Sequence, residues 1–194
     1  MTPEHEFQTE LKIPKERIAI LIGKDGEIKK ELEDFTNTKI DVDSKDGDVF
    51  IKGNDGLNIF DAKEVITAIG RGFNPKIAFL LLKGDYVFEI INIKDFSTSQ
   101  TGSARLKGRI IGTEGKTRKL IEEVTESYIS VYGKTISIIG QPESANLAKQ
   151  AVMNLLRGAQ HNTVYRWLER KRRALKQREF MEKVGIRKEE DDFE

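Results

Sequence analysis

The stretch Arg109–Thr125, RIIGTEGKTRKLIEEVT, places two glycines three residues apart, between an apolar run and a helical pattern. A similar stretch, AILIGKDGEIKKELEDFT at Ala19–Thr36, has its own glycine pair 89 residues earlier. Glycine has no Cβ, so each pair permits a tight turn and a close approach to the backbone. Each stretch therefore predicts a turn that leads directly into a helix.

The match between the two stretches extends into a repeat. Counted from the glycines, Leu32, Phe35, Ile40 and Val42 fall on Ile121, Val124, Ile129 and Val131. After a two-residue deletion, Val49, Ile51 and Gly53 fall on Ile136, Ile138 and Gly140, and Arg71-Gly72 coincides with Arg157-Gly158. Each copy has about 70 residues, enough for a core of its own, which predicts a duplicated domain rather than a solenoid.

The periodicity of apolar residues predicts the helices and strands of the first copy. Alternating residues predict strands at 7–13, 38–43 and 49–53, and helical spacing of apolar residues predicts helices at 15–21, 25–35 and 58–71. The order is strand, helix, helix, strand, strand, helix. We therefore expect an α+β fold in which three helices cover a three-stranded sheet.

The second copy repeats this order. We expect strands at 86–93, 127–132 and 135–140, a two-residue hairpin loop at Gly133-Lys134, and helices ending at Ile111 and spanning 116–126 and 143–157. The polar segment 94–108 is predicted to be a mobile loop. The predicted divisions are a first domain at 6–73, a linker at 74–84, a second domain at 85–158, a basic helix at 159–184 and a disordered acidic tail at 185–194.

Charge is distributed unevenly along a chain whose net charge is only +1. Residues 1–96 hold 14 Lys and Arg against 19 Asp and Glu, a net charge of −5. Residues 97–188 hold 19 against 8, a net charge of +11. Such asymmetry indicates a polyanionic partner for the second half.

The second glycine turn is the candidate binding site. The first turn of a helix has unpaired N–H groups and a partial positive charge, so it attracts phosphate. Six basic residues and one acid lie between 104 and 119. The predicted contacts to single-stranded RNA are Arg105, Lys107, Arg109, Ile110, Gly112, Thr113, Glu114, Gly115, Lys116, Thr117, Arg118, Lys119 and Ile129.

The first glycine turn is predicted to bind RNA more weakly than the second, or to have a different role. It comprises Gly23, Lys24, Asp25 and Gly26, and acidic residues are common around it, among them Asp41, Asp43, Asp46 and Asp48. Because these acids repel phosphate, we expect this copy to bind RNA weakly or to dock a protein instead.

The predicted basic helix offers a further cationic surface. Its candidate phosphate contacts are Arg166, Arg170, Arg172, Arg173 and Lys176, with Arg178 beyond them. The alternative is a solvated face with pairs such as Glu169–Arg173. Trp167 is expected to anchor the helix rather than to stack on a base.

The paired glycine turns resemble those of the KH domain, in which a G-x-x-G loop clamps about four nucleotides. This resemblance implies two tandem type I KH domains followed by the basic helix. At LKGRIIGTEGKTRKLIEEVT, KTISIIG and AVMNLLRGAQHNTVYRWLE, the chain also resembles the Partner of Nob One (Pno/Dim) family of ribosome assembly factors. Its short length is similar to that of the archaeal members.

The family resemblance implies a function in small-ribosomal-subunit biogenesis. It implies binding near the 3′ end of small-subunit rRNA, partnership with the nuclease that trims this rRNA, and an association with a translation initiation factor subunit. Two alternatives stay open: a protein scaffold, and a general KH protein of RNA turnover.

Other function classes are disfavoured by the sequence. His5 and His161 are far apart and lack a nearby carboxylate motif, so we expect neither catalysis nor a metal site, and no cofactor. The chain contains no cysteine, and no apolar run approaches the roughly 18 residues that a membrane span requires. We expect a cytoplasmic protein without membrane contact.

Overall fold

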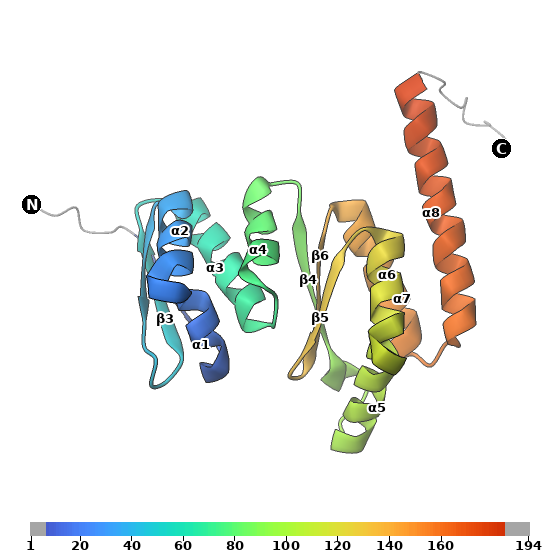
Figure 1. Cartoon of the computed structure of the whole chain (residues 1–194), viewed down its shortest axis with the longest axis horizontal. Coiled ribbons are helices and arrows are strands. Elements are labelled where there is room, and N and C mark those ends of the chain that lie inside the picture. Colours follow the sequence, from blue (N-terminus) through green and yellow to red (C-terminus); the bar gives the residue numbers. More distant parts are fainter. Residues whose placement is uncertain (1–6, 185–194) are drawn as a thin grey trace, which may run out of the picture.

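The computed structural model describes residues 7–184, and Figure 1 shows two similar bodies followed by a long helix. The predicted acidic tail at 185–194 lies outside the described residues, as does His5. Each body consists of a three-stranded antiparallel sheet with three helices on one face. The predicted α+β class and the order of elements are confirmed.

The first body contains β1 (Phe7–Lys12), α1 (Lys15–Ile22), η1 (Lys24–Gly26), α2 (Glu27–Thr36), β2 (Thr38–Val42), β3 (Asp48–Gly53) and α3 (Gly56–Gly70). Its strands lie in the order β1-β3-β2. Alternation along β2 and β3 turns Ile40, Val49 and Ile51 toward the helices, where all three are fully buried. The amphipathic face of α2 places Leu32 in the same core.

The second body contains β4 (Val87–Asn92), η3 (Ile93–Asp95), α5 (Gln100–Ile111), η4 (Thr113–Gly115), α6 (Lys116–Thr125), β5 (Tyr128–Tyr132), β6 (Thr135–Gly140) and α7 (Pro142–Leu156). Its strand order, β4-β6-β5, matches that of the first body. The predicted hairpin loop at Gly133-Lys134 is confirmed.

The predicted mobile loop at 94–108 is wrong, because most of this segment is helical. The hydroxyl of Ser99 accepts a hydrogen bond from Gly102 N at 3.0 Å and so caps α5. Leu106 and Ile110 then lie on one helix face and are buried in the core. Most residues of the first two turns are polar or small, which concealed the start of the helix.

The same hydrogen bonds join helix to edge strand in both bodies. Glu33 Oε1 accepts from Ile40 N at 2.7 Å, and Glu122 Oε1 accepts from Ile129 N at 2.7 Å. These carboxylates satisfy backbone groups at the edge of each sheet and hold the helix after each glycine turn against the neighbouring strand.

The segment between the bodies is helical and joins them. It forms α4 (Pro75–Ala78) and η2 (Phe79–Lys83), which pack into the first core together with Phe88 and Ile139 of the second sheet. The Ser130 hydroxyl on β5 donates to the carbonyl oxygen of Arg71 at 2.8 Å. The first body thus covers the face of the second sheet that is opposite its own helices.

The chain ends in α8 (His161–Val184), which lies beside α6 and α7 (Figure 1). Val164 and Leu168 are buried, and Trp167 packs against the second core, which confirms its predicted anchoring role. α8 therefore adds a further layer to the helical side of the second body.

Candidate nucleic-acid interface

The second glycine turn lies at the surface between α5 and α6. Thr113 and Glu114 are exposed, and their backbone angles direct the chain sharply into α6. Glu114 adopts a left-handed conformation, with φ of 54° and ψ of 25°, and Gly115 does the same. The amide of Lys116, the first residue of α6, donates to Thr113 O. No side chain caps the amides that follow it, because the N-cap residue is Gly115, and these amides are available to an anion.

Gly112 cannot be replaced without disturbing the turn. Its φ of 71° and ψ of 176° belong to a region that is essentially restricted to glycine. A Cβ built there would lie 2.2 Å from Thr117 Oγ1 and 2.8 Å from Thr117 N. The glycine thus allows α5 to approach the first turn of α6 closely.

Most of the predicted basic contacts lie around this turn. Arg105, Lys116 and Lys119 are exposed, and Lys107 is half-buried. Lys116 lies 3.6 Å from the Glu114 carboxylate, a pair that is highly exposed and therefore weak. The Arg118 guanidinium donates to Ile129 O at 3.1 Å and so bridges α6 and β5. The turn therefore lies within a cationic surface formed by α5 and α6.

Four of the residues predicted to contact RNA are buried or have their side chains bound elsewhere in the protein. Ile110 and Ile129 are core residues with exposed fractions of 0% and 2%, so their side chains cannot contact RNA directly. Thr117 is also buried. The Arg109 guanidinium donates to Leu155 O at 3.2 Å and to Ala159 O at 2.6 Å, which ties α5 to the end of α7. These four residues shape the turn from behind.

α8 supports the turn through two contacts that the sequence did not reveal. The Tyr165 hydroxyl donates to Thr117 Oγ1 at 2.8 Å. The His161 ring donates from Nε2 to Arg109 O at 2.9 Å, because a carbonyl oxygen can only accept. Thr117 lies directly behind Gly112, so α8 braces the helix junction that carries the turn.

A hollow lies beside the turn. Its lining residues are Arg105, Gly108, Arg109, Gly112, Thr113, Thr117 and His161. Both its cationic side chains and its two glycines suit the approach of a phosphodiester backbone.

The first glycine turn has nearly the same backbone geometry as the second. Gly23 has φ of 76° and ψ of 179°, and Asp25 has φ of 53° and ψ of 22°. The side chains around it differ, since only Lys24 is basic within the turn. Of the surrounding acids, Asp41 and Asp48 form ion pairs with Lys52 and Lys12 on the first sheet.

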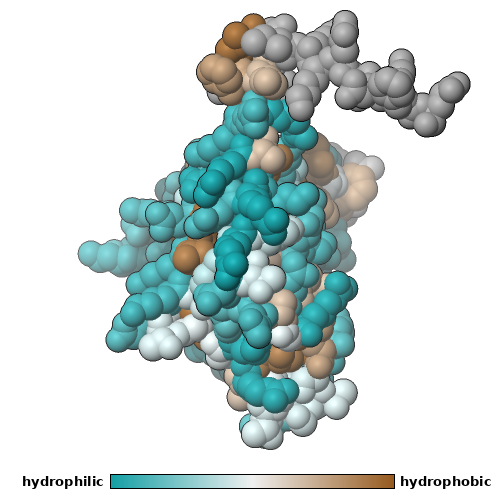
Figure 2. Space-filling model, turned by 90° about the vertical axis from the view of Figure 1, so that its right-hand side faces the viewer, coloured by the Kyte–Doolittle hydropathy of each residue, from teal (hydrophilic) through white to brown (hydrophobic). Residues whose placement is uncertain are grey.

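The basic residues of α8 fall into two groups. Arg172 and Lys176 pair with Glu126, at 3.0 and 3.5 Å, and fasten α8 to the end of α6. Arg166, Arg170 and Arg173 are exposed, and Arg173 also pairs with Glu169 at 3.5 Å, the pairing that the sequence suggested. Figure 2, which views the side where α8 lies, shows a predominantly hydrophilic surface.

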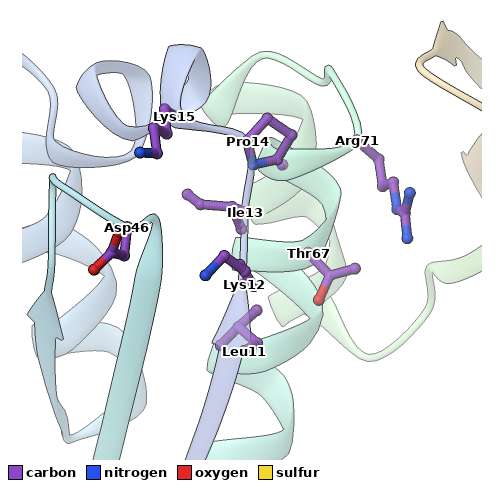
Figure 3. A pocket seen from close by; sticks show the side chains of 9 residues that line it. Leu11, Lys12, Ile13, Pro14, Lys15, Asp46, Thr67 and Arg71 are labelled. Atoms are coloured by element: carbon purple, nitrogen blue, oxygen red, sulfur yellow. The ribbon is translucent and has the colours of Figure 1, made fainter.

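A separate hollow lies in the first body, where β1 meets α3 (Figure 3). It is lined by Leu11, Lys12, Ile13, Pro14, Lys15, Asp46, Thr67, Gly70 and Arg71. Neither glycine turn contributes a residue to it, so it is not part of the candidate interface. Within residues 7–184, no group of His, Asp and Glu side chains could hold a metal ion, and no helix could span a membrane.

Comparisons with known proteins agree with this geometry. Residues 87–173 match a family model described as a eukaryotic-type KH domain (KH-domain type I), and residues 8–68 match a KH-domain model. A KH domain-containing protein of Methanocaldococcus jannaschii is 47% identical over 174 residues, which cover 88% of this chain and 76% of the relative.

Two further relatives carry names that describe a function. A chain in the crystal structure of an a/eIF2alpha–aDim2p–rRNA complex from Pyrococcus horikoshii is 46% identical, with a TM-score of 0.80 and coverage of 87% of this chain and 95% of that chain. The pre-rRNA-processing protein PNO1 of Chaetomium thermophilum is 32% identical over 105 residues, which cover 53% of this chain and 40% of that protein.

Proposed function

The chain belongs to the Pno1/Dim2 family of tandem KH-domain proteins, and on this premise we propose that it binds single-stranded rRNA through its second KH domain during small-subunit maturation. The observation that carries the proposal is the exposed turn Gly112–Gly115, with amides in the first turn of α6 that no side chain caps and basic side chains on both flanking helices. In this function the protein acts by binding and not by catalysis.

The exposed turn can grip RNA by its backbone. The uncapped amides that follow Lys116 in the first turn of α6 would donate to phosphate oxygens, while Arg105, Lys116 and Lys119 would neutralise neighbouring phosphates. The bases would then lie along the surface between α6 and β5, where Arg118 already spans the two elements. We place the target near the 3′ end of small-subunit rRNA, in the cytoplasm.

The test is the affinity of the full chain for single-stranded oligonucleotides from the rRNA 3′ end. Gly112→Asp should weaken binding at least 30-fold, because it adds both a side chain and a negative charge to the turn. The double variant Lys116→Glu/Lys119→Glu checks this without altering a strained glycine, and Gly23→Asp serves as the matched change in the first domain.

Salt dependence gives a second measure of the same contact. Three neutralised phosphates on a single strand predict a slope of log K against log salt of about −2. The charge-reversal double variant should flatten this slope. Equal losses from Gly112→Asp and Gly23→Asp, or an affinity that does not depend on salt, would contradict the assignment to the second domain.

The proposed partners are proteins as well as RNA. The Pyrococcus complex contains a translation initiation factor subunit, which supports an association of this chain with such a subunit. We also place the rRNA-trimming nuclease among its partners. The acidic surroundings of the first glycine turn favour a scaffold function for the first domain, and general RNA turnover is the second candidate. Binding of unrelated single strands with equal affinity would favour the turnover function.

A further inference from the structure

The repeat extends past the two KH folds into the helical segment that follows each of them. α3 and α7 each have 15 residues and are each followed by four connecting residues before the next helix, α4 or α8. Arg17 donates to the carbonyl oxygens of Ile69 and Phe73, just as Arg109 donates to those of Leu155 and Ala159. The acceptor pairs occupy equivalent positions, so α4 with η2 corresponds to the beginning of α8.

The two equivalent helices have very different lengths. α8 continues to Val184, whereas the first copy leaves the helical path at Lys83 and turns at Gly84, where φ is 72°. The part of α8 beyond the equivalent point pairs with Glu126 through Arg172 and Lys176, and with Glu143 through Arg178. The first body therefore lacks the helix that would cover the equivalent surface of α2 and α3.

This uncovered surface carries large apolar side chains. Phe35, Leu57 and Phe60 are 69%, 66% and 54% exposed, and we call these three residues the α2–α3 surface. In the repeat, these residues are equivalent to Val124, Glu143 and Asn146. In the second body those three residues line two hollows beside the distal part of α8, which is the part that contains Arg172, Lys176 and Arg178. Three large apolar residues are thus exposed on the surface whose equivalent in the second body is covered by α8, and such a group indicates a contact site.

The border of this surface is acidic. Asp61 and Glu64 follow Leu57 and Phe60 on α3, and Asp34 precedes Phe35 on α2. Among the side chains that the structure describes, none of these three carboxylates has a basic group within ion-pair distance. Burial raises the pKa of Asp61, aided by the charge of Asp55, and burial raises the pKa of Glu64, aided by Asp61. These carboxylates would gain from a cationic neighbour.

We propose that the α2–α3 surface binds a basic amphipathic helix of a partner protein, laid along the first KH domain as the distal part of α8 lies along the second. The apolar stripe of the partner helix would cover Phe35, Leu57 and Phe60. Its Lys or Arg side chains would pair with Asp34, Asp61 and Glu64, as Arg172 and Lys176 pair with Glu126. This proposal does not depend on RNA binding by the second domain.

The test uses a labelled synthetic peptide with the sequence of residues 161–184, a basic helix of the required kind, titrated into the full chain. Saturable binding is expected, and the double variant Leu57→Asp/Phe60→Asp should weaken it at least tenfold. Both residues are exposed, so the variant should fold with an unchanged melting temperature. Phe50→Asp, which alters an exposed aromatic residue on the opposite face of the first sheet, should leave the affinity unchanged.

Four results would overturn the proposal. The peptide could fail to bind, or Phe50→Asp could weaken it as much as the double variant does. Binding could instead be lost in Glu126→Lys and retained in the double variant, in which case the peptide displaces α8. Finally, sedimentation could show that the chain associates with itself through Leu57 and Phe60, in which case the occupant is α8 of a second copy.

Discussion

Tyr165 and Thr117, 48 residues apart in the sequence, are joined by a hydrogen bond of 2.8 Å that connects α8 to the glycine turn. Thr117 Oγ1 also occupies the space that a Cβ on Gly112 would need. The C-terminal helix therefore does more than enlarge the cationic surface, because it fixes the residue on which the turn rests.

Tyr165→Phe tests this support. Loss of this one hydrogen bond at a half-buried site should cost about 1 kcal/mol of unfolding free energy. The turn should also become less well ordered, so affinity for single-stranded RNA should fall about two- to fivefold. Urea unfolding and fluorescence anisotropy measure the two effects. Tyr86→Phe, which changes a half-buried tyrosine just before β4 and away from the turn, is the control, and an equal loss of RNA affinity in both variants would contradict a specific role for Tyr165.

The two glycines of the second turn should respond differently to alanine. Gly115→Ala places a Cβ near only Lys119 Cε, at 3.9 Å, so its cost should be the left-handed strain of about 1–2 kcal/mol. Gly112→Ala adds a clash with the Thr117 backbone nitrogen to a conformation that only glycine adopts readily. Gly112→Ala should therefore lose clearly more stability and more RNA affinity. Equal unfolding free energies for the two variants would show that Thr117 moves freely.

Much of the fold could be predicted because local patterns and the repeat agree. The glycine pairs predicted two turns. Leu32 in the first copy and Ile121 in the second lie at helical spacing from their apolar neighbours, which predicted the helix after each turn. The comparison of two copies strengthened each weak local signal. The polar start of α5 escaped prediction, because its cap at Ser99 precedes residues that are typical of loops.

The candidate interface was predicted less completely, because sequence spacing does not show which way a side chain points. Arg109 belongs to the basic run, yet its guanidinium donates to the carbonyl oxygens of Leu155, at the end of α7, and Ala159, in the connection to α8. Ile129 lies on the strand beside the turn, but strand alternation directs it into the core. Contacts such as Tyr165 with Thr117 depend on how α8 packs and have no local signature.

Glu126 should make the attachment of α8 dependent on pH. The hydrogen bond from Arg172 and the charge of Lys176 lower the pKa of Glu126 below its ordinary value of 4.5. A lowered pKa in the folded state stabilises the fold above the unfolded-state pKa, and this contribution disappears as the pH falls through the folded-state value. Glu126→Gln should therefore be less stable than the unmodified chain at pH 7, and the difference should shrink progressively as the pH falls below 4.5.

Urea unfolding at a series of pH values measures this difference. Glu123→Gln, an exposed change in the last turn of α6, is the control and should show no such trend. A difference for Glu126→Gln that persists undiminished at acid pH would mean that the ion pairs with α8 do not contribute to stability.

Gly72 and Gly158 offer a matched test of how the two domains are joined. They are equivalent in the repeat and have φ of 99° and 98°. A Cβ on Gly72 would lie 2.7 Å from Ser130 Oγ and 3.0 Å from Tyr132 Cβ, on the strand of the second sheet that contacts the first body. A Cβ on Gly158 would meet nothing within 4 Å. The two alanine variants share the same backbone strain, and only Gly72→Ala adds a clash between the domains.

Gly72→Ala should therefore loosen the domain interface, whereas Gly158→Ala should lose only the conformational contribution of about 1–2 kcal/mol. Small-angle scattering should show a larger radius of gyration for Gly72→Ala alone, and its urea unfolding should separate into two transitions as the domains lose their coupling. If both variants kept the compact dimensions of the unmodified chain and unfolded alike, the hydrogen bond from Ser130 to Arg71 and the apolar contacts around Phe88 would be insufficient to fix the arrangement.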